Sequence, residues 1–466
     1  MKYSLLIVAF LGSLWVFTNG CKKDSFITSG DARVRATADT LHFDTVFTTT
    51  GSITKSFKII NENNQKLRLN RVKLMGGLSS AYKMNVDGIS SAELTNIDID
   101  ANDSIYVFVS VTINPNLNNL AFIVRDSILI DYNGNNRFVQ LEAFGQNANF
   151  LRNRVIIGNV VWTNNLPYVI LGSLRIDSTA SLTIQPGCRI YSHADAPIII
   201  DGTMIVNGTK SDSVSFSGDR LDPEYKDLPA SWPGLYFRGT SKNNALTYAV
   251  IKNAYQAIVV EKPSVNANPK LQITQCIVDN AYDAGFLFVN TSVNADNCLI
   301  SNCGSNIAIA YGGAYTITHC TAASFSNYYI SHKNPVLQVN NYAIQSGAII
   351  AANLNAVFRN CIFWGEEGFV ENELVVNKQT GTSYTVLFDR VLYRGAVSPN
   401  ATYNNAIQNQ DPLFDSIDVT KKIYDFHTSK SPAAPGINKG VLTSLLKDLD
   451  NRNRNNGLPD LGCYEK

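Results

Sequence analysis

Five acidic residues lie close together near the middle of the sequence, and paired carboxyl groups are what enzymes use to hydrolyse glycosidic bonds. One carboxylic acid protonates the leaving oxygen, and a second carboxylate acts as base or nucleophile. Four of the five fall in residues 218–229, a polar stretch that is typical of a loop. We therefore expect solvated loop carboxylates here, with a catalytic pair as the alternative. The five residues are Asp195, Asp219, Asp222, Glu224 and Asp227.

A second chemistry would be elimination from an acidic polysaccharide. This reaction needs a basic side chain to remove a proton and acidic side chains to hold calcium. No lysine or arginine lies between Lys270 and Lys333. The later basic candidates have no defined acidic partner, so a polysaccharide lyase or glycosidase with a divergent site is an alternative function. These candidates are Lys333, Arg359, Arg390 and Arg394.

The sequence lacks the motifs of several other kinds of chemistry. There is no GxSxG or HExxH motif and no phosphate-binding glycine loop. The cysteines form no CxxC pair and no zinc-type cluster with histidine. The formal net charge is +1, and no basic run is interleaved with aromatic residues. We expect no cofactor, no metal and no nucleic-acid partner.

Aromatic residues favour binding over catalysis. Tyrosine and tryptophan rings can stack on the apolar face of a sugar while their polar atoms form hydrogen bonds. Several of them lie in the long insertion between Cys320 and Cys361, and an insertion in a regular array is a common place for function. The candidate glycan-binding residues are Trp232, Tyr236, Tyr328, Tyr329, Tyr342 and Lys333.

The elements that would position these residues show a repeat. Cys276, Cys298 and Cys320 are 22 residues apart, and Asn280 and Asn302 follow the first two by four residues. A period in this range indicates a solenoid, in which strands of successive coils pair about 4.8 Å apart. Cysteine suits the buried interior, and asparagine tolerates the left-handed backbone of a corner. We therefore interpret the cysteines as packing residues rather than redox or metal groups.

Residues 149–466 contain further motifs in a fixed order. Pro186-Gly187 and Gly202-Thr203 are followed by the segment 231–237, which contains Trp232 and Gly234. Together with motifs at 411–414, 424–426, 431–436, 448–454 and 459–465, this order resembles right-handed parallel β-helix proteins of the pectate-lyase-like superfamily. The resemblance implies that residues 149–466 form a β-helix. It also implies that a capping segment, about 411–466, closes the end of the solenoid.

Residues 39–148 have a different pattern. Short alternating strands, such as 56–60, 104–109 and 126–130, are separated by turn-forming residues, which favours a β-sandwich. The segments 50–52 and 55–63 resemble bacterial immunoglobulin-like spacer domains. The expected fold class is therefore all-β, with an immunoglobulin-like β-sandwich followed by a right-handed parallel β-helix.

The first residues predict export. Lys2 precedes an apolar run from Leu5 to Phe17, which is the length of a signal-peptide core. Gly20-Cys21 after this run resembles a bacterial lipoprotein signal, which implies cleavage after residues 1–20 and lipidation of Cys21. The residue after this cysteine is Lys22 and not Asp, which resembles lipoproteins that are sent on to the outer membrane of Gram-negative cells. Residues 21–38 would form a tether, and the lipid would be the sole contact with the membrane.

The sequence therefore favours a surface-anchored, non-catalytic protein that binds a glycan or another cell-envelope component through its β-helix. A lyase or glycosidase is one alternative. A structural adhesin that binds protein partners is another.

Overall fold

The computed structural model describes residues 25–47, 52–113, 122–223, 225–454 and 457–466. The chain divides into two compact units, residues 1–147 and 148–466. Within the described residues the sole helical segment is a 3-10 turn, Gly77–Ser79, so the expected all-β fold class is confirmed. No helix in this part of the chain is both long and apolar enough to span a bilayer. Cys21 and the signal segment lie outside the described residues.

The first unit is a β-sandwich of two five-stranded sheets that share one apolar core. Its strands alternate between buried and exposed positions, as in Leu67–Leu74, because each sheet packs on its partner through one face only. The immunoglobulin-like type of this sandwich stays a prediction. One sheet has the order β1 (Val34–Ala36), β3 (Lys55–Asn61), β8 (Ser104–Val111), β5 (Tyr82–Val86), β6 (Ile89–Ser90). The other has the order β2 (Thr40–Phe47), β10 (Asn135–Gln146), β9 (Phe122–Tyr132), β4 (Leu67–Leu74), β7 (Glu93–Ile99).

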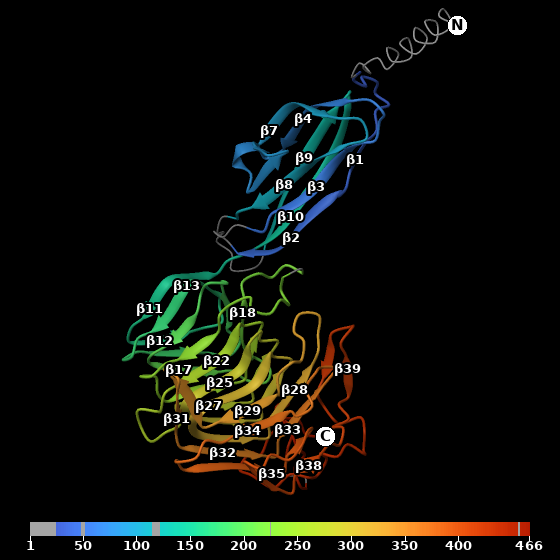
Figure 1. The fold of residues 1–466 in the computed structure, drawn as a ribbon. Helices are drawn as coiled ribbons and strands as arrows, with labels where there is room; N and C mark the ends of the chain where they lie inside the picture. Colours follow the sequence, from blue (N-terminus) through green and yellow to red (C-terminus); the bar gives the residue numbers. More distant parts are fainter. Residues whose placement is uncertain (1–24, 48–51, 114–121, 224, 455–456) are drawn as a thin grey trace, which may run out of the picture. The chain divides into compact units, whose positions relative to one another are not determined.

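The second unit is a parallel β-helix in which 26 strands pair from coil to coil (Figure 1). Its first coil begins with β11 (Asn149–Ile156), and β13 (Tyr168–Ile176) of the second coil pairs with β11 in parallel. The later strands form three faces. Face A contains β15 (Arg189–Ser192), β18 (Val214–Gly218), β21 (Ala249–Lys252), β24 (Ile277–Asp279), β26 (Leu299–Ser301), β28 (Thr321–Phe325), β33 (Ile362–Glu366), β36 (Leu392–Tyr393) and β38 (Ile407–Gln408). Face B contains β16 (Ile198–Ile200), β19 (Leu235–Phe237), β22 (Gln256–Glu261), β29 (Leu337–Asn340) and β34 (Leu374–Asn377). Face C contains β12 (Asn159–Trp162), β14 (Ser181–Ile184), β17 (Thr203–Asn207), β20 (Asn244–Thr247), β23 (Leu271–Thr274), β32 (Leu354–Arg359), β35 (Tyr384–Asp389) and β37 (Thr402–Asn404).

Two long strands, β25 (Ala284–Asp296) and β27 (Ser305–Thr318), turn a corner and belong to faces B and C at once. After β29 the chain leaves the solenoid in a small hairpin, β30 (Tyr342–Gln345) and β31 (Ala348–Ala351), before it returns as β32. A second hairpin, β39 (Ser416–Asp418) and β40 (Ile423–Asp425), follows the last coil.

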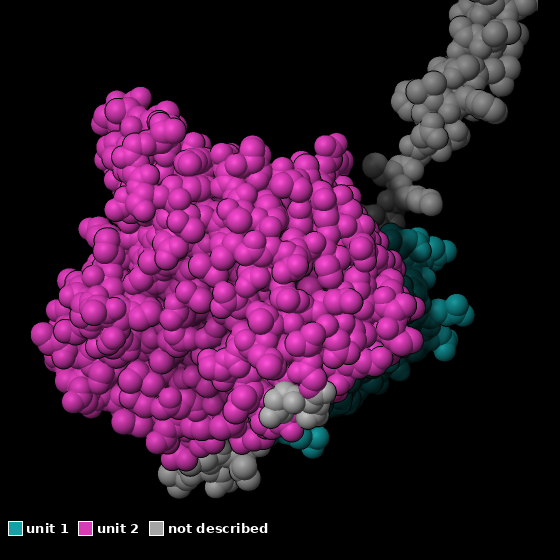
Figure 2. Space-filling model, turned by 90° about the horizontal axis from the view of Figure 1, so that it is seen from below, with its two compact units in different colours: residues 1–147 teal, residues 148–466 magenta. Residues whose placement is uncertain are grey.

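The interior is filled by stacked side chains, as the 22-residue period predicts. Val278 pairs in register with Ile300, and Ile300 with Ala322, and all three side chains belong to the buried core. The cysteines beside these strands are fully buried and not joined in disulfides, and the backbone N–H of Cys298 points to Sγ of Cys320 at 3.4 Å. Figure 2 shows a continuous surface over the second unit, with no opening into the solenoid on that side.

The asparagines stand at corners, as the sequence predicts. Asn253, Asn280 and Asn302 have φ values of 61°, 59° and 52°, in the left-handed region that asparagine tolerates. Nδ2 of Asn280 donates to Oδ1 of Asn253 at 2.7 Å, so neighbouring coils are joined by a side-chain ladder.

The C-terminal segment lies lengthwise along face A, and its predicted role of closing the end of the solenoid stays a prediction. Its contacts step from coil to coil: Asn360 donates to the carbonyl oxygen of Val441 at 2.8 Å, and Asn297 to that of Lys447 at 2.8 Å. The outer side of face A is apolar in these coils and needs cover from water. Face A residues and terminal residues form one buried cluster: Leu299, Ala323, Phe325, Ile362, Trp364, Leu392, Phe426, Leu449, Leu461 and Cys463.

Candidate functional site

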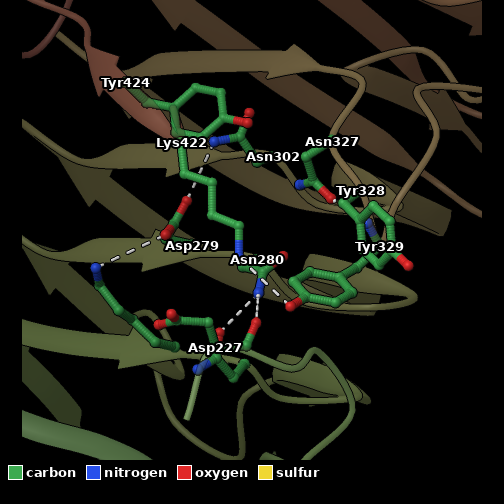
Figure 3. A pocket seen from close by; sticks show the side chains of 11 residues that line it. Asp227, Asp279, Asn280, Asn302, Asn327, Tyr328, Tyr329, Lys422 and Tyr424 are labelled. Carbon is green, nitrogen blue, oxygen red and sulfur yellow. Dashed lines mark hydrogen bonds and ion pairs between the residues drawn. The ribbon is translucent and has the colours of Figure 1, made fainter. Parts of the chain in front are cut away.

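Two of the predicted ring residues lie together in one pocket. Tyr328 and Tyr329 line a cavity of about 220 Å³ at the corner between faces A and B (Figure 3). We call it the corner pocket. Its lining comes from six segments that are separated in sequence. Its lining residues are Asp227, Lys252, Asn253, Asp279, Asn280, Asn302, Asn327, Tyr328, Tyr329, Lys422 and Tyr424.

The floor of the corner pocket is the asparagine ladder. Nδ2 of Asn280 donates to Oδ1 of Asn253 at 2.7 Å and to the carbonyl oxygen of Asp227 at 2.9 Å. Nδ2 of Asn253 donates to the carbonyl oxygen of Lys226 at 2.7 Å. The ladder therefore fixes the loop that carries Asp227 at the rim.

Charged groups of both signs face the cavity. Asp279 accepts hydrogen bonds from Oγ of Ser301 at 2.7 Å and Nδ2 of Asn302 at 3.4 Å, and it pairs with Lys252 at 3.7 Å. The Lys422 side chain extends across the pocket, with Nζ 3.4 Å from the Tyr329 hydroxyl and 4.8 Å from the centre of its ring (Figure 3). The pocket thus contains two carboxylates and two ammonium groups.

Aromatic rings form one wall. Tyr328 is 89% exposed and meets Tyr329 edge to face, with ring centres 5.2 Å apart. The Tyr424 hydroxyl is buried and has no hydrogen-bond partner in the described structure. Burial, together with the nearby Asp279 carboxylate, raises the pKa of Tyr424, so this hydroxyl stays a neutral donor.

The loop that carries the tyrosine pair is anchored in the interior. Oδ1 of Asn327 accepts the backbone N–H groups of Tyr329 and Ile330 at 2.8 and 2.7 Å. Further along the same loop, His332 is buried and its Nε2 lies 2.9 Å from Oε1 of Glu373. These contacts hold the loop in one conformation beside the ladder.

The remaining ring candidates lie elsewhere. Trp232 corrects the prediction: it is 1% exposed, and its indole N–H donates to the carbonyl oxygen of Lys252 at 2.8 Å, so its ring has no free face. Tyr236 lines a separate hollow of about 410 Å³ on the outer side of face B. Tyr342 is half-buried in the hairpin of β30 and β31, and Lys333 is exposed; neither lines the corner pocket.

Three described members of the acidic cluster of residues 195–227 take separate positions. Asp227 lines the corner pocket, whereas Oδ2 of Asp219 lies 2.7 Å from Nδ1 of His193, and burial raises the pKa of Asp219. Asp222 pairs with Arg220 at 3.3 Å. Glu224 lies outside the described residues.

The basic candidates serve structural contacts. Arg359 pairs with Asp389 at 2.9 Å, Arg390 donates to the carbonyl oxygen of Lys439 at 3.2 Å, and Arg394 donates to that of Gly365 at 2.5 Å. Among the described residues, no group of three or more His, Cys, Asp or Glu side chains is arranged to hold a metal ion.

Sequence reasoning missed Lys422 and Tyr424, which follow the tyrosine pair by more than 90 positions. No local pattern points to them. The asparagine repeat could have located the floor, because it marks the corner that the pocket occupies.

The comparisons with known proteins give no family. No family model matches the chain, and no curated protein matches it. A family 123 glycoside hydrolase from Clostridium perfringens is 11% identical, with a TM-score of 0.19; the match covers 24% of this chain and 25% of that chain. A PapD-like domain of human CEP192 is 10% identical, with a TM-score of 0.18, over 27% of this chain and 91% of that chain.

A GH87 alpha-1,3-glucanase from Streptomyces thermodiastaticus is 10% identical, with a TM-score of 0.24, over 76% of this chain and 89% of that chain. This chain therefore spans a quarter of the first of these structures and most of the other two. Similarities of this strength assign no function to it.

Proposed function

We propose that this protein binds a saccharide in the corner pocket without converting it. The observation that carries the proposal is the exposed ring of Tyr328 standing beside a floor of amides and carboxylates from three successive coils. A sugar has apolar C–H faces and polar hydroxyl groups at its edge. Tyrosine rings suit the faces, while amide and carboxylate oxygens accept hydrogen bonds from the hydroxyls.

The hydrogen bonds of Asp279 favour binding over hydrolysis. Its Oδ1 accepts hydrogen bonds from Ser301 and Asn302, and Nζ of Lys252 lies 3.7 Å from its Oδ2, which leaves acceptor sites for a ligand hydroxyl. A glycosidase needs one carboxylic acid that is free to give its proton to the leaving oxygen. Asp279 is instead held as a hydrogen-bond acceptor and ion-pair partner.

We propose the following cellular setting. The chain is exported, cleaved before Cys21 and held at the outer membrane or cell surface of a Gram-negative bacterium by lipid on that residue. The sandwich acts as an immunoglobulin-like spacer, and the solenoid presents its pocket to polysaccharides of the surroundings or the envelope. The membrane is contacted through the lipid anchor.

The test separates binding from turnover. The purified protein is passed over immobilised neutral and acidic polysaccharides, and reducing ends and unsaturated products are measured in parallel. We expect retention without product. Retention should fall roughly threefold to tenfold in Tyr328→Ala, because one stacking ring is lost from an exposed position.

Tyr342→Ala is the matched control, because it removes a tyrosine of the same insertion that lies outside the corner pocket. Equal loss in both variants would exclude the corner pocket as the site. Release of product from any polysaccharide would overturn the non-catalytic function in favour of a lyase or glycosidase.

A further inference from the structure

A second cavity lies on face C and shares no lining residue with the corner pocket. It has a volume of about 580 Å³ and runs across β25, β27 and β32, with the loop 263–269 as one wall. We call it the face C groove. Its lining contains amides, hydroxyls and small apolar groups but no Asp, Glu, Lys or Arg, whereas the corner pocket has two of each charge.

The floor of the groove is made by outward-facing residues of adjacent coils. Asn294 of β25 pairs in register with Thr316 of β27, and Ala314 of β27 pairs with Asn355 of β32. The floor is low because Ala314 and Gly313 carry little or no side chain. A side chain at Gly313, where φ is 118°, would collide with the Tyr315 hydroxyl and the Thr291 carbonyl oxygen.

The wall of the groove is held in place by its own amides. Nδ2 of Asn266 and Nδ2 of Asn268 both donate to Oδ1 of Asn243, at 3.0 and 3.1 Å. Oδ1 of Asn266 also accepts the backbone N–H of Asn268 at 3.1 Å. The loop therefore stands beside the floor as a fixed ridge.

Polar groups of the groove are left without partners inside the protein. The side chains of Asn294, Thr316 and Asn355 form no hydrogen bond within the described structure. Thr291, which also lines the groove, is 2% exposed, and its hydroxyl oxygen is buried with no partner. A buried polar atom without a partner is costly, so a ligand hydroxyl that reached it would be favoured.

We propose that the face C groove is a second binding site, which takes an uncharged polysaccharide lying along the solenoid axis. A charged ligand would lose its hydration here and meet no opposite charge. A hydroxyl-rich neutral chain matches the free amides and hydroxyls in both donors and acceptors. The coils repeat about every 4.8 Å, close to the length of one pyranose unit in an extended chain, so successive sugars meet equivalent positions.

The test uses calorimetric titration of the whole protein with linear gluco-, xylo- and mannohexaose, and with hexagalacturonate as the acidic comparison. We expect at least one neutral hexaose to bind, with an affinity that does not change between low and high salt. Ala314→Arg fills the exposed floor with a bulky charge and should weaken this binding by more than about tenfold.

Asn294→Ala serves as a second, milder variant, which removes one free amide without adding bulk and should weaken the same binding severalfold. Tyr342→Ala is the control, because Tyr342 lines neither the corner pocket nor the face C groove and should leave this binding unchanged. Tyr328→Ala separates the two sites, because it changes the corner pocket alone. The proposal is overturned if no neutral hexaose binds, if hexagalacturonate competes equally, or if the neutral binding depends on Tyr328 and not on Ala314 and Asn294. If the proposed function of the corner pocket were wrong, only the results for Tyr328→Ala would differ from expectation, and those for Ala314→Arg and Asn294→Ala would stand.

Discussion

The sandwich and the β-helix place their polar groups in different environments. In the sandwich, Arg35 and Glu62 form an ion pair at 2.7 Å with side chains that are 52% and 40% exposed. In the β-helix, Arg454 is 2% exposed and donates to Asn297, to Gly462 and to the partly buried Glu465. The difference shows that the solenoid with its covered face buries charged side chains, whereas the described charged side chains of the sandwich stay in contact with water.

The buried polar side chains of the β-helix are needed at the corners of its coils. Each coil turns three times, and a turning backbone leaves carbonyl groups that no strand can pair. Side chains supply the donors: Nζ of the buried Lys270 reaches the carbonyl oxygens of Arg238, Gly239 and Glu261 at 3.2, 3.1 and 2.8 Å. In the sandwich, Nδ2 of the buried Asn61 serves the carbonyl oxygens of Gln65, Ile99 and Asp100 in this way, but no Lys or Arg of its described residues is buried.

The largest expected effect comes from Arg454→Met. This change leaves the acceptors of Asn297 and Gly462 unpaired and removes the cation beside Glu465, and removing one partner of a buried ion pair costs about 3–5 kcal/mol. Urea unfolding followed by tryptophan fluorescence reports the β-helix, because Trp162, Trp232 and Trp364 all lie there.

Arg452→Met is the control for Arg454, because it is exposed and donates one hydrogen bond to the carbonyl oxygen of Glu465 at 2.9 Å. It should cost less than about 1 kcal/mol. A similar loss in both variants would contradict the contrast between buried and exposed polar groups.

An intermediate effect on the unfolding free energy, which depends on pH, is expected from Asp296. Burial, with a smaller contribution from Cys298, raises the pKa of Asp296 to about 6, above the value of 3.8 for a free carboxyl. The folded state therefore keeps this proton while the unfolded state loses it, and the stability that Asp296 contributes falls as pH rises from 4 to 7. The change amounts to at most about 3 kcal/mol.

Asp296→Asn should remove this dependence, because the amide oxygen can still accept from Nε2 of Gln272, which lies 2.8 Å from the carboxylate. The variant should match the parent protein near pH 4 and exceed it in unfolding free energy near pH 7. Parallel stability profiles for the two proteins over this range would show that Asp296 is not protonated in the fold.

The smallest effect is expected in the sandwich. Arg35→Ala breaks the exposed pair with Glu62 and should change the unfolding free energy of the sandwich by less than about 1 kcal/mol. The change should disappear in concentrated salt, which screens exposed charges. A loss as large as that of Arg454→Met would mean that the two units do not differ in this respect.

The repeat made much of the solenoid predictable. Stacking forces equivalent residues into equivalent positions, so the spacing of Cys276, Cys298 and Cys320 gives the register directly. The same regularity shows where an insertion interrupts the coils, and that insertion supplied Tyr328 and Tyr329 to the corner pocket.

Other features needed the three-dimensional structure. Trp232 has the same residue type as a sugar-stacking ring, and only the coil geometry shows that it points inward. The terminal segment packs on the apolar outer side of face A. Leu299 and Ile362 lie there, but their residue types are the same as those of the interior, so the sequence does not show that they face outward. Lys422 joins the corner pocket because that segment folds back over the coils.

The position of the terminal segment also sets an order of events during synthesis. Coils pair with their neighbours and can form in sequence as the chain is made. The hydrogen bond from Gln275 to the carbonyl oxygen of Asp448 joins positions 173 residues apart, and the ion pair of Lys210 with Asp450 joins positions 240 apart. Until residues 436–463 are made, Leu299 and the other apolar residues of face A stay open to water. Premature termination of translation would thus yield a chain with ordered coils and an exposed apolar face. Chaperones and quality-control proteases would bind such a chain.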